Sequence, residues 1–487
     1  MNFASVTFLT FFASIIISLS IVQYAGKSKY DEPNQVQDNK RTVLSKRILL
    51  IASYLFYGWW DWRFCFLLFG VTFISWISAF PKEECLKERK NRIRWKTGII
   101  VILCVLALFK YFNFFIESFC RVWNIDNIQS LHIILPVGIS FYTFQALSYS
   151  IDVYRGKVEK ESDFWEYALY ISFFPQLVAG PIIKAADFLP QLKEKRRITW
   201  KGLESGIQIF LFGMLKKLVL ADNLSVFVDE VYRTPSAFHT VTIWLAVISY
   251  SIQIYLDFSG YSDMAIGCAK CLGYDFSRNF NLPYLSKNIS EFWKRWHISL
   301  SSWLQEYLYI PLGGNRKGKR RTYINLMITM LLGGLWHGAS WTFVLWGGIH
   351  GAALCIDKVR KNHLQRRENV VYKCLGIIGT SLFVTICWVF FRATTFENAI
   401  QVLKGLFVIQ NGILHLFSWS LVAIGIIFVA YGVAIIRSKY KKLSVYEGFY
   451  PIFDMNTIGG LTIVMLAVFA IIGFAYVQGN PFIYFQF

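Results

Sequence analysis

The sequence predicts an all-α protein that passes through a membrane many times. Of its 487 residues, 55% are hydrophobic and only 16% are charged, whereas soluble domains carry about 25% charged residues. The apolar residues also occur in long runs, and a helix needs about 20 mostly apolar residues to cross the hydrocarbon core. Backbone polar groups cannot stay unpaired in lipid, so these runs are expected to be helices.

Five apolar runs are the clearest candidate spans: Phe3–Val22, Ile99–Phe119, Val241–Phe258, Leu421–Ile436 and Leu461–Val477. The first run lacks a basic lead and a clear cleavage site, so we expect a retained span rather than a removed signal peptide. With interrupted and shorter apolar stretches included, we expect about 11 to 13 transmembrane or re-entrant helices.

The net charge of +20 would suggest nucleic-acid binding in a soluble protein. Here the basic residues gather in short loops between apolar runs, as the positive-inside rule describes for cytoplasmic loops. We therefore expect no nucleic-acid partner and place all six clusters on the cytoplasmic face: Lys27–Arg47, Lys82–Lys96, Lys184–Lys201, Arg316–Arg321, Lys358–Lys373 and the short Arg437–Lys442.

The stretch Ile48–Phe80 lies between the first two basic loops. If both loops are cytoplasmic, this stretch must cross the membrane and return. The segment Gly58–Arg63 interrupts it with three tryptophans and two charged residues, a composition typical of a membrane interface. We predict a hairpin with its outer turn at this segment.

The middle of the chain predicts interrupted helices. Phe164–Ile183 contains prolines and a glycine, and Asn279–Gly314 interleaves aromatic and polar residues. Irregular backbone at membrane depth is tolerated only against protein or a water-filled cavity. We expect short amphipathic, interfacial or re-entrant helices here.

His337 is the strongest candidate for chemistry. It lies in the glycine-rich segment Gly333–Trp341 between two apolar runs, and ionisable residues in such surroundings indicate function. Burial keeps an imidazole neutral and able to accept a proton, so His337 is a candidate general base. The alternative is a packed histidine that donates to a backbone carbonyl. We interpret His350 as structural, because 13 residues of helix rise about 20 Å and the two rings can meet only if the helix breaks.

His297 is the second candidate. Its neighbours Lys294 and Arg295 are equally consistent with interface anchors, in which case His297 lies beside them without a catalytic role. Asp257 and Asp263 are acidic residues in an apolar stretch. They are expected to orient a histidine, to pair with Arg278 or Lys294, or to form structural ion pairs.

Other common sites are not indicated. Nine cysteines are scattered, and the Cys268–Cys271 pair lies in an apolar helical stretch with no second pair, so we expect packing and no metal site. The sequence has no phosphate-binding Gly-Lys loop and no GxSxG elbow.

Taken together, the motifs resemble the membrane-bound O-acyltransferase family, and within it the bacterial branch of alginate O-acetyltransferase membrane subunits. The matching stretches span nearly the whole chain in family order: Leu135–Gln145, Phe173–Pro181, Leu256–Ala265, Phe292–Leu300, Leu335–Ala339 and Pro481–Phe487.

The resemblance implies one integral membrane domain, 1–487, in which a helical funnel surrounds a central tunnel. Its parts would be N-terminal spans (1–130), a catalytic core (131–360) and C-terminal spans (361–487). His337 would match the essential histidine of the family, and His297 its upstream polar partner. We assign substrate binding to side chains near them: Trp336, Trp296, Lys294, Arg295, Asp257 and Ser299.

The resemblance also implies a multi-pass protein of the bacterial inner membrane, surrounded by lipid. No cofactor would be bound. An acyl thioester, acetyl-CoA in the first instance, would donate from the cytoplasm toward an extracytoplasmic polysaccharide or a partner acetyltransferase. One alternative is D-alanyl transfer from a carrier protein to teichoic acid, but that branch is shorter, and Leu421–Phe487 favours the acetyl branch. A transporter and a scaffold in a polysaccharide export complex are the non-catalytic alternatives.

Overall fold

The computed structural model describes residues 1, 3–24, 35–125, 131, 133–178, 180–363, 369–441 and 452–476. Over these residues the protein is built from helices, and the β structure among them is one isolated bridge between Phe238 and Ile413. The all-α prediction is confirmed. The motif Pro481–Phe487, His132 and parts of the first, fifth and sixth basic clusters lie outside the described residues.

The chain divides into two compact units, which are described separately. Unit 1 comprises Met1–Phe210 and Met264–Ser277, and unit 2 comprises Leu211–Asp263 and Arg278–Phe487. The boundary lies within helix α10 and again within α12. Each unit combines stretches from more than one of the three parts expected from the sequence, so that division stays a prediction, as do the funnel and the tunnel.

Unit 1 contains the first helices of the chain: α1 (Val6–Tyr24), α2 (Gln35–Gly58), α3 (Arg63–Ser78), α4 (Lys82–Lys87), α5 (Arg89–Trp123), α6 (Ile139–Tyr154), α7 (Phe164–Ser172), α8 (Phe174–Leu177), α9 (Ala185–Lys193) and most of α10 (Trp200–Met214).

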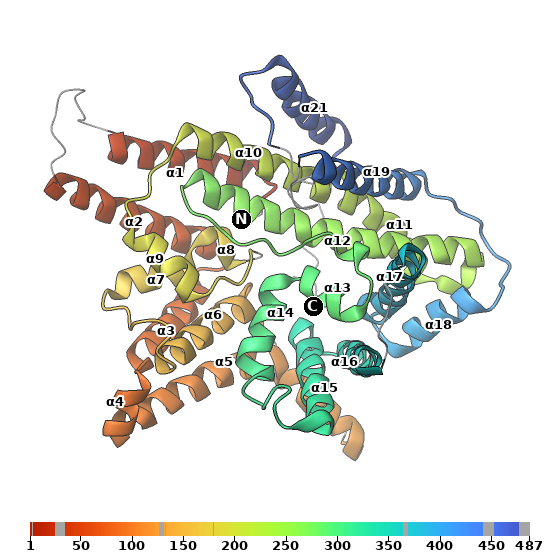
Figure 1. Ribbon diagram of the computed structural model, residues 1–487, viewed down its shortest axis with the longest axis horizontal. Coiled ribbons are helices and arrows are strands. Elements are labelled where there is room, and N and C mark those ends of the chain that lie inside the picture. Colours follow the sequence, from red (N-terminus) through yellow and green to blue (C-terminus); the bar gives the residue numbers. More distant parts are fainter. Residues whose placement is uncertain are drawn as a thin grey trace. The chain divides into compact units, whose positions relative to one another are not determined.

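Unit 2 contains the π-helix η1 (Leu215–Ala221), α11 (Asp222–Arg233), η2 (Pro235–Ala237), most of α12 (Thr240–Cys271), η3 (Pro283–Leu285), α13 (Ile289–Arg295), α14 (Ile298–Leu304), the π-helix η4 (Gln305–Tyr309), α15 (Gly318–His337), α16 (Trp341–His363), α17 (Val370–Arg392), α18 (Phe396–Phe407), α19 (Ser418–Lys441) and α21 (Ile458–Phe474). Figure 1 labels most of these helices.

Five described helices are long and apolar enough to cross a membrane: α1, α5, α12, α17 and residues 418–438 of α19. Helices α3 and α21 are apolar but shorter. Four of the five runs named from the sequence therefore coincide with long apolar helices, and the fifth corresponds to α21. Helix α17 is not among the five apolar runs named from the sequence. The total of about 11 to 13 pieces stays a prediction.

A break between two helices lies at the predicted outer turn, and the crossing and return of this stretch through the membrane stay a prediction. Helix α2 ends at Gly58 and α3 begins at Arg63. Trp59 and Trp62 are 64% and 67% exposed, and the Arg63 guanidinium lies 2.6 Å from a carboxylate oxygen of Asp61. The predicted interruption farther along is also present, because α7 ends at Ser172 and α8 is a separate short helix.

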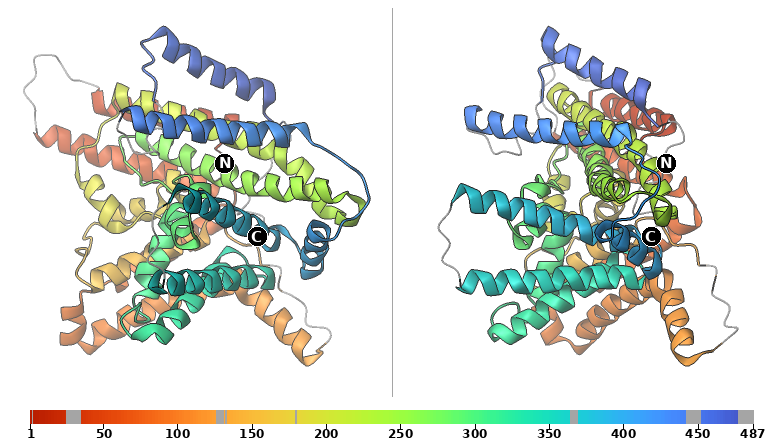
Figure 2. Two further views of the ribbon diagram at one scale, coloured as in Figure 1. Left: turned by 45° about the vertical axis from the view of Figure 1, so that its right-hand side comes forward. Right: turned by 90° about the vertical axis from the view of Figure 1, so that its right-hand side faces the viewer.

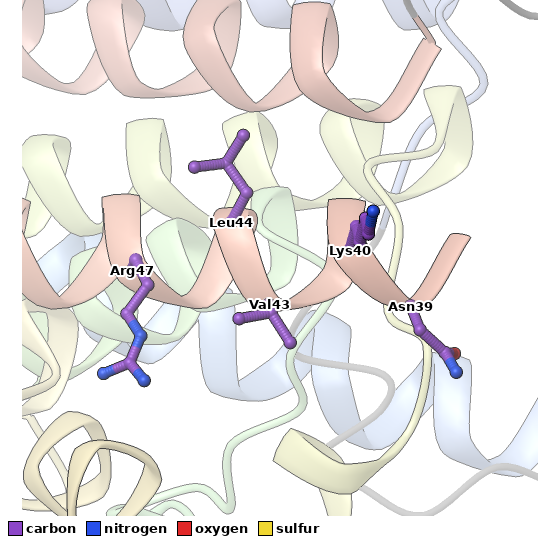
Figure 3. Close-up of a pocket in the computed structure, with 5 residues that line it drawn as sticks. All are labelled: Asn39, Lys40, Val43, Leu44 and Arg47. Carbon is purple, nitrogen blue, oxygen red and sulfur yellow. The ribbon is translucent and has the colours of Figure 1, made fainter. Parts of the chain in front are cut away.

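The surface of α2 carries part of the first basic cluster. A shallow cavity of about 480 Å³ lies there, lined by Asn39, Lys40, Val43, Leu44 and Arg47. In Figure 3 the Leu44 side chain points up and the Arg47 side chain points down along the helix surface that lines the cavity. The Arg47 guanidinium lies 5.1 Å from the centre of the Trp165 ring on α7. At this distance the cation is attracted to the face of the aromatic ring. Two of the five lining residues, Lys40 and Arg47, are basic, and no histidine lines the cavity.

In unit 2, α15 and α16 form an antiparallel pair at very close range (Figures 1 and 2). A Cβ at Gly347 would lie 2.2 Å from the carbonyl oxygen of Met330, and a Cβ at Gly334 would lie 2.3 Å from that of Phe343. Small residues are the usual means by which membrane helices bring their backbones together. These two glycines therefore determine how close the end of α15 lies to α16.

We expect Gly347→Ala to destabilise this helix pair by about 1–3 kcal/mol, because its methyl group would overlap the Met330 carbonyl. Gly348→Ala is the matched control, since its Cβ would meet its nearest neighbour, Leu331 Cδ2, at an ordinary 3.4 Å. Thermal unfolding of the purified protein in detergent measures the difference. Equal melting temperatures for the two variants would show that the close contact is not limiting.

Candidate active site

His337 is the last residue of α15, and its ring lies in an aromatic enclosure. The side chain is 2% exposed. Its ring centroid lies 5.1 Å from that of Trp336, 5.1 Å from that of Trp346 on α16 and 5.3 Å from that of Phe391 on α17. Gly338 ends the helix in an extended conformation, which allows α16 to return beside α15. Three helices therefore hold the His337 ring.

His297 lies at the bend between α13 and α14, and it is fully buried. Its ring centroid is 6.5 Å from that of His337, 5.8 Å from that of Trp336 and 4.6 Å from that of Phe258 on α12. The fold thus brings together two histidines that are 40 positions apart in the sequence. The catalytic roles predicted for the two residues stay a prediction.

The backbone of His297 has a left-handed conformation, with φ of 42°. This conformation costs a residue with a Cβ about 1–2 kcal/mol, and such strain gathers at functional sites. It persists here because the surrounding backbone is hydrogen-bonded. The amide of Ile298 donates to the Asn279 carbonyl at 2.8 Å, and that of Asn281 donates to the Arg295 carbonyl at 2.9 Å.

The side chain of Asn279 connects this bend to helix α12. Its Oδ1 lies 3.2 Å from Nδ1 of His297 and accepts hydrogen bonds from the backbone amide and the hydroxyl of Ser299, at 3.2 and 2.8 Å. Its Nδ2 donates to the hydroxyl of Ser262 on α12 at 3.3 Å. One buried amide therefore joins the bend, the start of α14 and α12.

A layer of aromatic rings lies against the two histidines. Trp296 is fully buried, and its ring centroid lies 5.0 Å from those of Phe280 and Trp388. Trp388 in turn stacks on Trp346 at 5.5 Å. Because aromatic rings bury large apolar areas, this layer separates the imidazoles from water.

His350 meets the condition that the sequence analysis set for it, because the helix does break between it and His337. The return of α16 places Trp346 between the two histidines, with its ring centroid 4.8 Å from that of His350 and 5.1 Å from that of His337. His350 is fully buried, and neither of its ring nitrogens has a hydrogen-bond partner within the described residues. Its structural role stays a prediction.

Of the other proposed substrate-binding residues, some lie beside the two histidines and others do not. Trp336 touches both histidines, and Ser299 reaches His297 through Asn279. Lys294 is exposed. Arg295 is held by Glu291, at 2.8 Å, and by the carbonyl of Asn281. Their contribution to substrate binding stays a prediction.

Asp257 and Asp263 pair with two adjacent lysines of the π-helix η1. Lys217 Nζ lies 2.5 Å from Asp257 and 2.7 Å from Asp222, and Lys216 Nζ lies 2.5 Å from Asp263. All five side chains are buried. These contacts correspond to the structural ion pairs left open by the sequence, although the cations are not the expected Arg278 and Lys294.

Sequence reasoning missed several members of this arrangement: Asn279, Trp346, Phe391 and the lysines of η1. For Asn279 a signal was present, since it begins the polar segment that interrupts the apolar pattern. The lysines also had a signal, because two adjacent cations within an otherwise apolar stretch are unusual at membrane depth. Within the described part of the chain, no three His, Cys, Asp or Glu residues are grouped so that they could hold a metal ion.

Comparison with known proteins gives the family. Residues 158–397, which include both histidines, match the model of the membrane-bound O-acyltransferase family. A protein of Pseudomonas aeruginosa named "Probable alginate O-acetylase AlgI" is 43% identical over 365 residues, which cover 74% of this chain and 69% of that protein. The chain belongs to the membrane-bound O-acyltransferase family.

Two further relatives show the range of activities in the family. The peptidoglycan O-acetyltransferase of Helicobacter pylori is 37% identical over 393 residues, covering 75% of this chain and 74% of that protein. The teichoic acid D-alanyltransferase of Streptococcus thermophilus is 29% identical over 353 residues, covering 67% and 81%. Family membership and these relatives make the protein a membrane-bound O-acyltransferase, as the sequence predicted.

The ion pairs lead to a test of Asp257. If its role is structural, Asp257→Asn removes a charged partner of Lys217 and lowers stability by about 2 kcal/mol, while the KM for the acyl donor is unchanged. Asp275→Asn is the control, since its pair with Lys270 is exposed and should change stability by less than about 1 kcal/mol. A raised KM at unchanged melting temperature would instead place Asp257 at the substrate.

Proposed function

We propose that this enzyme moves an acetyl group from a cytoplasmic thioester, acetyl-CoA in the first instance, to hydroxyls on the far side of a bacterial inner membrane. The acceptor is an extracytoplasmic polysaccharide or a partner acetyltransferase. The observation that carries the proposal is the pair of buried imidazoles 6.5 Å apart between apolar helices. The relatives named as acetylating enzymes support the acyl group, at 43% and 37% identity.

The reaction needs a base, because a hydroxyl is a weak nucleophile until its proton is removed. In the proposed mechanism His337 takes this proton as the hydroxyl oxygen attacks the thioester carbonyl. The carbon–sulfur bond then breaks, the sulfur leaves and receives a proton, and the products are an ester and a free thiol. His297 lies next to His337 and acts as its polar partner.

The aromatic enclosure contributes by excluding water. A thioester beside a general base is open to hydrolysis, and exclusion of water from a closed site prevents this side reaction. The rings of His297 and His337 are 0% and 2% exposed. Substrate therefore reaches them only when surrounding side chains move aside, which couples entry of the substrate to a local rearrangement.

The charge pattern supports a cytoplasmic donor. The phosphates of CoA are polyanionic, and the basic clusters, which include Lys40 and Arg47 on α2, provide a field that attracts them. The charge of these clusters also agrees with membrane topology, so their contribution to donor binding is one of attraction rather than of specific recognition.

We expect His337→Ala to lower acetylation by at least about 100-fold, the usual contribution of a general base. Cells that lack the protein are complemented with each variant, and ester-linked acetate and ester-linked D-alanine are measured on the exopolysaccharide, the peptidoglycan and the teichoic acid. His415→Ala is the control, because His415 lies in the loop after α18 and is partly exposed.

Membrane fractions are probed for equal amounts of each variant, so that loss of expression is not counted as loss of activity. Full acetylation with His337→Ala would refute the assignment of the base and favour a transporter or a scaffold. Loss of D-alanine esters rather than acetate would refute the acetyl assignment and favour the teichoic acid alternative.

A further inference from the structure

The orientation of the Asn279 side chain is fixed by Ser299. The backbone amide of Ser299 faces one end of the Asn279 amide at 3.2 Å, and the Ser299 hydroxyl faces the same end at 2.8 Å. A backbone N–H can only donate, so the atom that faces it must be the amide oxygen and not the NH2 group. The NH2 group then points toward the hydroxyl of Ser262, at 3.3 Å, where an acceptor is available.

This orientation determines where His297 carries its proton. Nδ1 of His297 lies 3.2 Å from the same oxygen, and a carbonyl oxygen can only accept a hydrogen bond. Nδ1 must therefore carry the hydrogen. A neutral imidazole has one N–H and one lone pair, so the lone pair is on Nε2, the nitrogen on the other edge of the ring.

The groups around His297 prevent its imidazole ring from rotating by half a turn. The backbone of residues 279–281 is hydrogen-bonded to that of residues 295–298 on either side of His297. The ring of Phe258 meets the imidazole at 4.6 Å with an interplanar angle of 89°, and Trp336 meets it at 5.8 Å. A rotation of the ring by half a turn would place a carbon against the Asn279 oxygen.

We propose that Asn279 is a positioning residue that holds His297 in the tautomer with its proton on Nδ1, so that His297 presents Nε2 to the reaction as a hydrogen-bond acceptor. This inference rests on the proposed function and refines it. To polarise the thioester carbonyl, His297 would have to donate a hydrogen bond from Nε2. A neutral ring with its hydrogen on Nδ1 has no hydrogen on Nε2, so this role is excluded for it. In the proposed mechanism the hydroxyl gives its single hydrogen to His337, so Nε2 of His297 accepts a hydrogen bond from an N–H of His337.

The tautomer can be observed without turnover. The full-length protein is labelled with 15N- and 13C-histidine and reconstituted in lipid, and solid-state NMR distinguishes protonated from unprotonated ring nitrogens. Subtraction of the spectrum of His297→Gln assigns the His297 signals. We expect a protonated Nδ1 and an unprotonated Nε2, and we expect Asn279→Leu, which has no acceptor, to lose this single state. A protonated Nε2 in the natural protein would overturn the inference.

Activity provides the second readout. Asn279→Asp keeps an acceptor for Nδ1–H but adds a negative charge that stabilises the protonated ring. A protonated His297 has no lone pair with which to accept from His337, so we expect the acid limb of the pH–rate profile of Asn279→Asp to move to higher pH, with kcat above that limb within about tenfold of normal. Asn279→Leu should lower kcat by about 100-fold and leave the KM for acetyl-CoA unchanged.

Asn325→Leu is the matched control. Asn325 is also fully buried in unit 2, and its amide donates to the carbonyl of Gly314 on the chain before α15. Equal losses of kcat for Asn279→Leu and Asn325→Leu at equal melting temperatures, or an unshifted profile for Asn279→Asp, would overturn the positioning role. Because the NMR result needs no acetyl transfer, failure of the proposed function and failure of this inference are distinguishable.

Discussion

An irregular segment buried among apolar helices has to satisfy its own polar backbone, and the histidine site of this protein depends on how that is done. The bend that carries His297 pairs its backbone with residues 279–281 and uses the side chain of Asn279 for the remaining donors. These bonds hold a left-handed residue in place. The Asn279 side chain also contacts the imidazole, so the residue that stabilises the bend also orients the His297 ring.

Much of the fold follows from the apolar runs, because a bilayer leaves a backbone few alternatives to a helix. The hairpin turn at Trp59–Trp62 and the interrupted stretch around Asn279 were readable from clustered tryptophans and polar groups. The exact helix ends and the division of the chain into two units were not, since they depend on contacts between distant segments. The close approach of Gly334 and Gly347 is an example. Neither glycine stands out in the sequence, because its role in helix packing depends on contact with the other helix.

For the site, the sequence singled out His337 and His297, because an ionisable side chain in an apolar run is costly to keep. It grouped Lys294, Arg295 and Asp257 with them by nearness in the chain or by motif. The structure separates these groups by direction: Lys294 is exposed, Arg295 pairs with Glu291, and Asp257 pairs with Lys217. Which way a side chain points around a short helix cannot be read from a motif, and for the same reason Asn279 and Trp346 were missed.

The adjacent lysines of η1 restrict movement of α12 along its own axis. Lys217 and Lys216 form ion pairs with two residues of α12, Asp257 and Asp263, which are about 9 Å apart along the helix axis. A slip of α12 by one turn, about 5 Å, would pull both ammonium groups from their counter-ions in surroundings where lone charges are very unfavourable. Helix α12 also carries Phe258 and Ser262, which touch His297 and Asn279. The two ion pairs thus fix the axial register of the helix beside the site.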